Sequence, residues 1–253
     1  MSGVVGKLLW SVRHRGASGT VRAAAHWVRR TITREAVSRP HPFDVEHGTD
    51  TGGLIAGGDL ASGHTSDRHI EGYAAVPPSR FRGILARWQA GGPAHALADY
   101  CFVDLGCGKG RALLLASQLG FREVIGVELN PSLAQIARAN VTLWAAAGKA
   151  RAPMRVEQKD ALELEWPVGP CVVFLFNPFD AQLMRQIAES MAAAFRNRPS
   201  DLEVLYYKPN HADALPDSFR MAWCETIEID AQELAADPVA GRDDETRAYQ
   251  LNG

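Results

Sequence analysis

The stretch CFVDLGCGKGRALLLA, residues 101–116, carries the strongest indication of fold in this chain. It begins with an apolar run typical of a buried strand, continues with Gly106, Gly108 and Gly110 at alternate positions, and ends in a helix-like run. Glycine permits positive φ and lets a ligand approach the backbone, and a helix start offers unpaired N–H groups. We therefore expect a ligand at this turn. A tight turn with a purely structural role is the alternative.

Beyond this turn, strand-like and helix-like stretches alternate, as in βαβ units with a parallel sheet. The expected strands are 101–105, 123–129, 153–157, 171–176 and 203–208, and the expected helices lie near 110–119, 131–147 and 180–196. The last two strand-like runs, FRMAWCETIEI (219–229) and TRAYQL (246–251), are joined by an acidic segment without a clear helix. We expect these two runs to pair antiparallel.

An acidic residue ends the second expected strand. Glu128, in VIGVELN, follows Gly106 by roughly 20 positions, the spacing of an acid that binds ribose hydroxyls in nucleotide sites. The dinucleotide fingerprint G-x-G-x-x-G is not met, because Arg111 follows Gly110 where helix and strand should pack closely. The spacing favours a different cofactor, and a nicotinamide-dependent oxidoreductase stays as an alternative.

Over residues 80–253 the chain resembles the class I S-adenosylmethionine-dependent methyltransferases. The resemblance rests on Asp104 with the G-x-G-x-G turn, on Glu128, on Asp160 in EQKDALEL, and on the late antiparallel pair. It implies an α/β, doubly wound, mostly parallel seven-stranded sheet of Rossmann-like type, preceded by a helical or irregular extension.

The resemblance also implies how S-adenosylmethionine is bound. Asp104 and the glycine turn would hold the methionine part, Glu128 the ribose hydroxyls, and Asp160 the adenine amino group. Asp104 could instead be a turn cap, and Asp160 could cap the turn after its strand. The full expected set of cofactor-binding residues is Asp104, Gly106, Cys107, Gly108, Gly110, Glu128, Leu129, Asp160, Ala161 and Asn177.

The fourth expected strand ends in CVVFLFNPFD, which brings Asn177, Pro178 and Phe179 to the same sheet edge. This tripeptide resembles a shortened N-P-P-[YF] motif of N-methyltransferases and the Asn-containing loops of seven-stranded lysine methyltransferases. The resemblance implies that the Asn177 carbonyl orients the target nitrogen and that Phe179 packs against the acceptor. Because the second proline is missing, an amine is favoured over a planar base or amide. A strand-ending turn without a catalytic role is the alternative.

Residues 41–79 are rich in Gly, His and Pro and predict a long irregular segment that serves as a lid or substrate segment. Within it, Tyr73 and Pro77 resemble a Tyr- and Pro-containing segment that precedes the core of some lysine methyltransferases. Its histidines lack the partners and spacing of a zinc site, so no metal is expected, although one of them could accept a proton. These histidines are His41, His47, His64 and His69. Lys109 and Arg111 could contact the loop or the substrate, or simply be solvated.

Residues 1–40 form a basic arm whose only acid is Glu35, whereas the whole chain has a formal net charge of −2. Nucleic acid is therefore an unlikely partner for the chain as a whole. Two short amphipathic helices with Trp10 and Trp27 are expected, and they could lie on anionic lipid, act as a transit peptide, or dock on the domain. Without an apolar run long enough to span a bilayer, we expect a soluble, cytoplasmic protein that could contact a membrane peripherally.

The four cysteines, Cys101, Cys107, Cys171 and Cys224, occur singly and are expected to be reduced core residues. The leading functional hypothesis is a methyltransferase acting on an amine nitrogen of a protein side chain or small molecule. One alternative is a small-molecule O-methyltransferase, for which the His-bearing segment could supply a base. Another is a module that binds the cofactor without chemistry.

Overall fold

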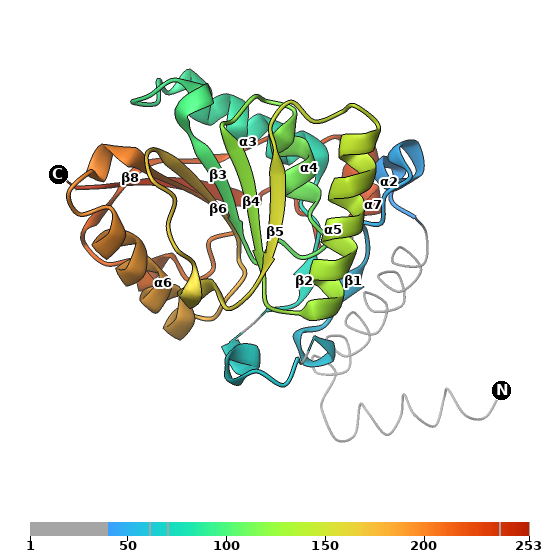
Figure 1. Cartoon of the computed structure of the whole chain (residues 1–253), viewed down its shortest axis with the longest axis horizontal. Helices are drawn as coiled ribbons and strands as arrows, with labels where there is room; N and C mark the ends of the chain where they lie inside the picture. Colours follow the sequence, from blue (N-terminus) through green and yellow to red (C-terminus); the bar gives the residue numbers. More distant parts are fainter. Residues whose placement is uncertain (1–39, 61, 70, 238, 253) are drawn as a thin grey trace, which may run out of the picture. The chain divides into compact units, whose positions relative to one another are not determined.

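Seven strands form one mixed sheet in the order β5-β4-β3-β6-β7-β9-β8 (Figure 1). The computed structural model describes residues 40–252 apart from 61, 70 and 238. The strands are β3 Cys101–Leu105, β4 Glu123–Glu128, β5 Met154–Gln158, β6 Cys171–Phe176, β7 Leu202–Tyr207, β8 Phe219–Thr226 and β9 Glu245–Leu251. The first five are parallel, and β9 pairs antiparallel with both β7 and β8. The predicted seven-stranded, mostly parallel α/β fold is confirmed.

Helices cover both faces of the sheet and follow the strands closely. They are α3 Pro78–Ala90, α4 Arg111–Ser117, α5 Pro131–Ala146 and α6 Ala181–Ala194. Side-chain caps fix two of the starts, because Asn130 accepts hydrogen bonds from the first turn of α5 and Asp180 from that of α6. Each cap comes within four residues of a strand end, so both helices begin at the carboxyl edge of the sheet.

Two apolar clusters hold these layers together. On one face, Phe102 of β3 packs in a cluster with Leu113 and Trp144 from α4 and α5. On the other face, Val103 belongs to a cluster with Ile187 of α6. Every residue of β3 is buried, which explains its continuous apolar run.

The segment before the sheet is more ordered than its composition predicts. It contains α2 Pro42–His47 and the antiparallel pair β1 Leu54–Ile55 and β2 Tyr73–Ala74. Phe43 stacks on Trp144 with ring centroids 5.7 Å apart, and Asp44 accepts hydrogen bonds from the backbone of residues 51 and 52. The expectation of an unpacked, irregular segment was therefore wrong in part, because a few buried anchors order a glycine-rich chain.

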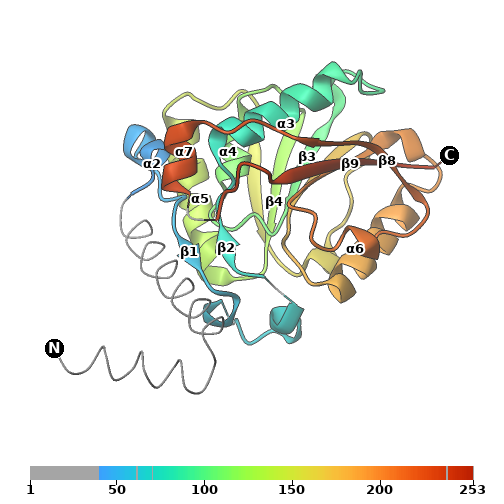
Figure 2. The same cartoon turned by 180° about the vertical axis from the view of Figure 1, so that it is seen from behind.

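The connection between β8 and β9 also differs from the expectation, because it contains the short helix α7, Ala231–Ala236. Asp230 caps α7 by accepting hydrogen bonds from two backbone N–H groups. Seen from behind in Figure 2, α7 lies beside α2, and the buried Nε2 of His41 is 3.1 Å from Oδ2 of Asp237. A helix of six residues is too short to give a detectable periodicity.

Three of the cysteines are buried and free, as expected, but Cys224 is exposed. Cys224 lies on β8, at the edge of the sheet, where alternate side chains face solvent. Among the described residues, no helix is long and apolar enough to cross a membrane. The basic arm, with its expected helices and membrane contact, lies outside the described residues.

Candidate active site

The three alternate glycines form the turn between β3 and α4, and all three have positive φ: 75° at Gly106, 54° at Gly108 and 87° at Gly110. A Cβ at Gly106 would lie 2.8 Å from Cβ of Pro178, and one at Gly108 would overlap the ring of Tyr73. The turn is fastened to the next strand, because the N–H groups of Gly106 and Cys107 both donate to the carbonyl of Val127. Side chains are thus excluded by conformation and by close neighbours.

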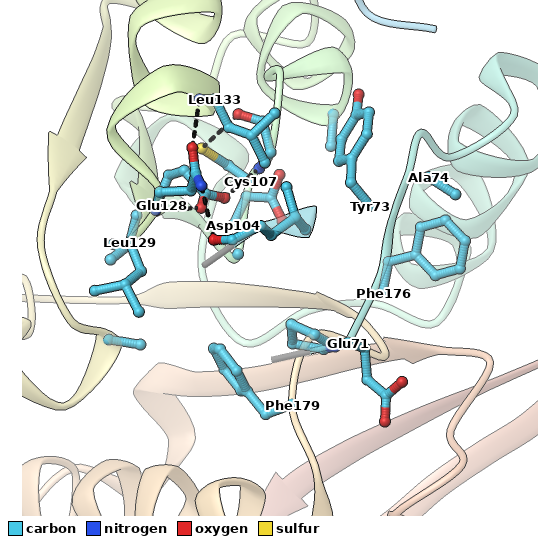
Figure 3. Close-up of a pocket in the computed structure, with 18 of the residues that line it drawn as sticks. Glu71, Tyr73, Ala74, Asp104, Cys107, Glu128, Leu129, Leu133, Phe176 and Phe179 are labelled. Carbon is cyan, nitrogen blue, oxygen red and sulfur yellow. Dashed lines mark hydrogen bonds between the residues drawn. The ribbon is translucent and has the colours of Figure 1, made fainter. Parts of the chain in front are cut away.

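A cavity lies at the carboxyl edge of β3, β4 and β6, between this turn and a roof formed by Leu60, Ser66 and residues 71–76 (Figure 3). Most residues of the predicted site line it: Tyr73, Asp104, Gly106, Cys107, Gly108, Glu128, Leu129, Asp160, Ala161, Pro178 and Phe179. Gly110 does not line the cavity and starts α4 instead, and Asn177 lies just outside its lining. This is the edge at which open α/β sheets bind ligands.

Glu128 ends β4 with both carboxylate oxygens in use. Oε2 accepts a hydrogen bond from the N–H of Gly108, and Oε1 accepts one from the N–H of Asn130, each at 2.8 Å. Burial raises the pKa of Glu128, and these backbone donors act in the opposite direction. Each oxygen keeps a second lone pair, so the carboxylate can also accept hydrogens from a pair of hydroxyl groups.

Asp104, on β3, is a buried acid of the site. It is only 4% exposed, and within the described part of the chain no donor hydrogen-bonds to its carboxylate. Burial, and then the neighbouring Glu128, raise the pKa of Asp104 to about 8. A buried acid without a partner is suited to bind a cationic group such as an ammonium.

Asp160 performs the capping role that was the alternative for it, and it also contacts the roof of the cavity. Its Oδ1 accepts a hydrogen bond from the N–H of Leu162 at 2.9 Å. Its Oδ2 accepts one from Oγ of Ser66 at 2.5 Å, and Nδ1 of His64 is 3.6 Å away. Ser66 was not identified from the sequence, because a serine within a polar segment carries no distinctive pattern.

The Asn-Pro-Phe turn after β6 is held by the segment that roofs the cavity. The N–H of Glu71 donates to the carbonyl of Pro178 at 3.2 Å, and the N–H of Asp180 donates to the carbonyl of His69 at 2.8 Å. Asn177 has φ of 42°, a left-handed conformation that asparagine tolerates better than most residues. Its Oδ1 accepts a long hydrogen bond, 3.4 Å, from Oη of Tyr206 on the neighbouring strand β7.

Arg111 is buried and contacts the segment 41–79, which was one of the alternatives for it, so the alternative of a solvated side chain was wrong. Its Nε donates to Oγ1 of Thr51 at 2.8 Å, and its other nitrogens lie 3.3 Å from Asp237 and 3.7 Å from Asp44. Lys109 reaches the same segment and lies 2.7 Å from Asp50. These two cations therefore fasten residues 44–51 to the glycine turn.

Tyr73 completes the wall opposite Glu128 (Figure 3). Its Oη donates to the carbonyl of Thr51 at 2.6 Å, and burial raises its pKa well above the ordinary value. The residues around the cavity fit S-adenosylmethionine: a buried acid for the ammonium, an acid for the ribose hydroxyls, and a turn bare of side chains. Within the described residues, no group of three His, Cys, Asp or Glu side chains is arranged to bind a metal.

Residues 103–192 match the family described as a methyltransferase domain. The matched segment contains the glycine turn, Glu128, Asp160 and the Asn-Pro-Phe turn. No curated protein matches the chain in sequence.

Similar solved structures are distant in sequence. An RNA methyltransferase from Salinibacter ruber in complex with S-adenosyl-L-homocysteine is 17% identical, with a TM-score of 0.44, and the match covers 70% of this chain and 94% of that one. A ribosomal-protein methylase from Lactobacillus delbrueckii is 15% identical, with a TM-score of 0.45, covering 68% and 77%. A protein of the NADB-Rossmann superfamily from Streptococcus agalactiae is 10% identical, with a TM-score of 0.46, covering 68% of each chain.

The domain match and the cavity define the class of this protein as a transferase of methyl groups. It is an S-adenosylmethionine-dependent methyltransferase, with S-adenosylmethionine as its cofactor.

Proposed function

We propose that the protein transfers the methyl group to an amine nitrogen of a protein side chain or a small molecule. The observation that supports this most is the Asn-Pro-Phe turn, which is fastened to the roof of the cavity on both sides of Phe179. The two hydrogen bonds between residues 69–71 and 178–180 hold the turn at the edge of the cofactor cavity. A positioned acceptor site is the main requirement of this reaction, since the sulfonium cofactor supplies an already activated methyl group.

The cofactor roles follow from the chemistry of each side chain. Asp104, which has no partner among the described residues, pairs with the cofactor's ammonium, and Glu128 accepts the two ribose hydroxyls. Asp160 accepts the adenine amino hydrogen with the oxygen that Ser66 contacts. The bare glycine turn lets the methionine part approach the backbone, and Leu129 and Ala161 line the cavity beside Glu128 and Asp160.

On the acceptor side, Asn177 orients the nitrogen. Among the described residues its Oδ1 accepts one hydrogen bond, a long one of 3.4 Å from Oη of Tyr206, so it retains a lone pair for an amine hydrogen. Phe179 is buried and lines the cavity, where its ring can pack against the acceptor's methylene chain. An amine hydrogen held by Asn177 turns the nitrogen lone pair toward the methyl carbon.

The test is the variant Asn177→Ala, assayed with tritium-labelled S-adenosylmethionine and an extract of cells that lack the protein. Loss of a hydrogen bond made in the transition state lowers turnover by about a hundred- to a thousandfold. Cofactor affinity should stay the same, because Asn177 does not line the cofactor cavity. Asn197→Ala, at an exposed position after α6, is the matched control and should retain full turnover.

The label should appear in an amine that is stable to mild alkali. Near-normal turnover by a folded Asn177→Ala variant would reduce the motif to a strand-ending turn. Label released by mild alkali would indicate a methyl ester, and label in an alkali-stable ether would favour O-methylation.

A further inference from the structure

Glu71 lines the cavity but has no role in binding the cofactor as assigned above. Figure 3 shows its side chain on the side of Phe176 and Phe179, away from Asp104 and Glu128. The carboxylate is 45% exposed, so it lies at the mouth of the cavity rather than within it. A carboxylate at this place faces the methyl acceptor, which enters the cavity from solvent.

The backbone of Glu71 is fixed, whereas its carboxylate makes no hydrogen bond with another described residue. Its N–H donates to the carbonyl of Pro178, and the following Gly72 packs so closely that a Cβ there would lie 2.8 Å from the carbonyl oxygen of Ile55. The roof segment therefore fixes the point from which this side chain extends, next to the Asn-Pro-Phe turn. Because this backbone is already ordered, binding of a partner to Glu71 does not lose free energy to backbone ordering.

Three other polar groups lie near Glu71 and the Asn-Pro-Phe turn, and they come from different elements. His211, after β7, has Nε2 at 3.8 Å from Oε1 of Glu71, which is too long for a hydrogen bond. The N–H of His211 and the side chain of Asn177 are both linked to Oη of Tyr206 by bonds of 3.4 Å. Glu71, His211 and Asn177 therefore offer acceptors close to the Asn-Pro-Phe turn, and none of the three carries a permanent positive charge.

The lysine and arginine side chains that line the cavity are engaged elsewhere. Arg111 lines it but is paired with Asp44 and Asp237, and Lys159 lines it at the Asp160 end and lies 2.8 Å from Glu157. Lys208, at the end of β7, lies 3.3 Å from Asp244 and donates to the carbonyl of Val239. No described basic side chain that lines the cavity is left to neutralise Glu71, so the mouth favours a cation.

We propose that Glu71 is the residue that selects the acceptor, and that it binds a protonated primary amine on a methylene chain, of the lysine type. This inference rests on the proposed amine methylation. The ammonium pairs with Glu71 while its methylene chain packs between Phe176 and Phe179. His211 takes one proton from the ammonium. The freed nitrogen lone pair then forms the bond to the methyl carbon, the carbon–sulfur bond breaks, and its electron pair stays on sulfur.

The experiment compares wild type, Glu71→Gln and the control Glu46→Gln, whose carboxylate is on the exposed side of α2 and does not line the cavity. Each protein methylates the same cell extract with labelled cofactor, either untreated or after its amines have been acetylated. Glu71→Gln should lower the methylation rate at low extract concentration by about tenfold or more, because one charge-assisted pair is lost. The methylation rate of this variant should recover as more extract is added. Cofactor affinity measured by calorimetry should change less than about twofold, which shows that the variant is folded.

The outcomes separate the two proposals. If wild type labels acetylated extract as well as untreated extract, or labels neither, amine methylation is overturned, and the role of Glu71 is overturned with it. Label that depends on free amines, but is transferred equally well by Glu71→Gln, would overturn only the role of Glu71. Loss of cofactor affinity in Glu71→Gln would assign the residue to the roof of the cavity rather than to acceptor selection.

Discussion

Replacing Asp104 by Asn tests the cofactor site, because it changes the number of protons released when the cofactor binds. The pKa of this buried acid is about 8, raised from 3.8 by burial and by Glu128. At pH 7 the carboxyl group of the free protein is therefore roughly nine-tenths protonated. It must ionise to pair with the cofactor's ammonium, so binding at pH 7 should release most of one proton, and the affinity should weaken by up to about tenfold for each pH unit below 8.

Calorimetry in two buffers with different heats of ionisation measures this proton release. Asp104→Asn should bind S-adenosylmethionine about 10- to 150-fold more weakly, the equivalent of a charge-assisted hydrogen bond of about 1.5–3 kcal/mol. The proton release should disappear in the variant. Binding by wild type without net proton release, or with the same release in Asp104→Asn, would refute the pairing of Asp104 with the ammonium.

Asp104→Asn should weaken cofactor binding but should raise the stability of the cofactor-free protein at pH 8. The folded protein binds this proton more tightly than the unfolded chain does, so the stability that Asp104 contributes is present below about pH 4 and is lost as the pH rises to about 8. Without cofactor, Asp104→Asn should therefore melt at a higher temperature than wild type at pH 8, by at least about 2–4 °C. A lower melting temperature would indicate that the carboxylate supports the fold.

Three further perturbations address the turn, the buried cations and the arm. Gly108→Val should abolish cofactor binding in a protein that still folds. The reason is that φ at Gly108 is 54° and that the new side chain would meet Tyr73. Full cofactor binding by calorimetry would contradict the assignment of the turn. Arg111→Met should lower the free energy of unfolding in urea by about 3–5 kcal/mol, because Asp44 and Asp237 lose their buried partner; a loss below about 1 kcal/mol would contradict this. Full-length protein should float with anionic vesicles more strongly than a chain that starts at Pro40, and equal flotation would exclude membrane contact by the arm.

The strands and the glycine turn could be predicted because their signals are local. β3 is buried on both faces and therefore reads as one apolar run, and the turn after it needs glycines at positive φ. Glu128 was predictable because a strand fixes its distance from the turn, and backbone donors now hold it where expected. Such features depend on neighbours that are close in sequence or on regular strand geometry.

The remaining features depend on partners far apart in the chain. Arg111 is buried by Thr51 and Asp237, which are 60 and 126 positions away, and nothing beside Arg111 in the sequence indicates them. Glu71 was missed for the same reason, since its place at the cavity mouth depends on a hydrogen bond to Pro178. The order of residues 41–79 likewise comes from a few buried anchors rather than from composition.

An experimental structure with S-adenosyl-L-homocysteine bound tests the central claim most directly. We predict that the ligand fills the cavity beside the glycine turn, with its ammonium on Asp104, its ribose hydroxyls on Glu128 and its adenine amino group on Asp160. Its sulfur should face the mouth formed by Glu71, Asn177 and Phe179. A ligand bound elsewhere, or bound here with its ribose away from Glu128, would contradict the account.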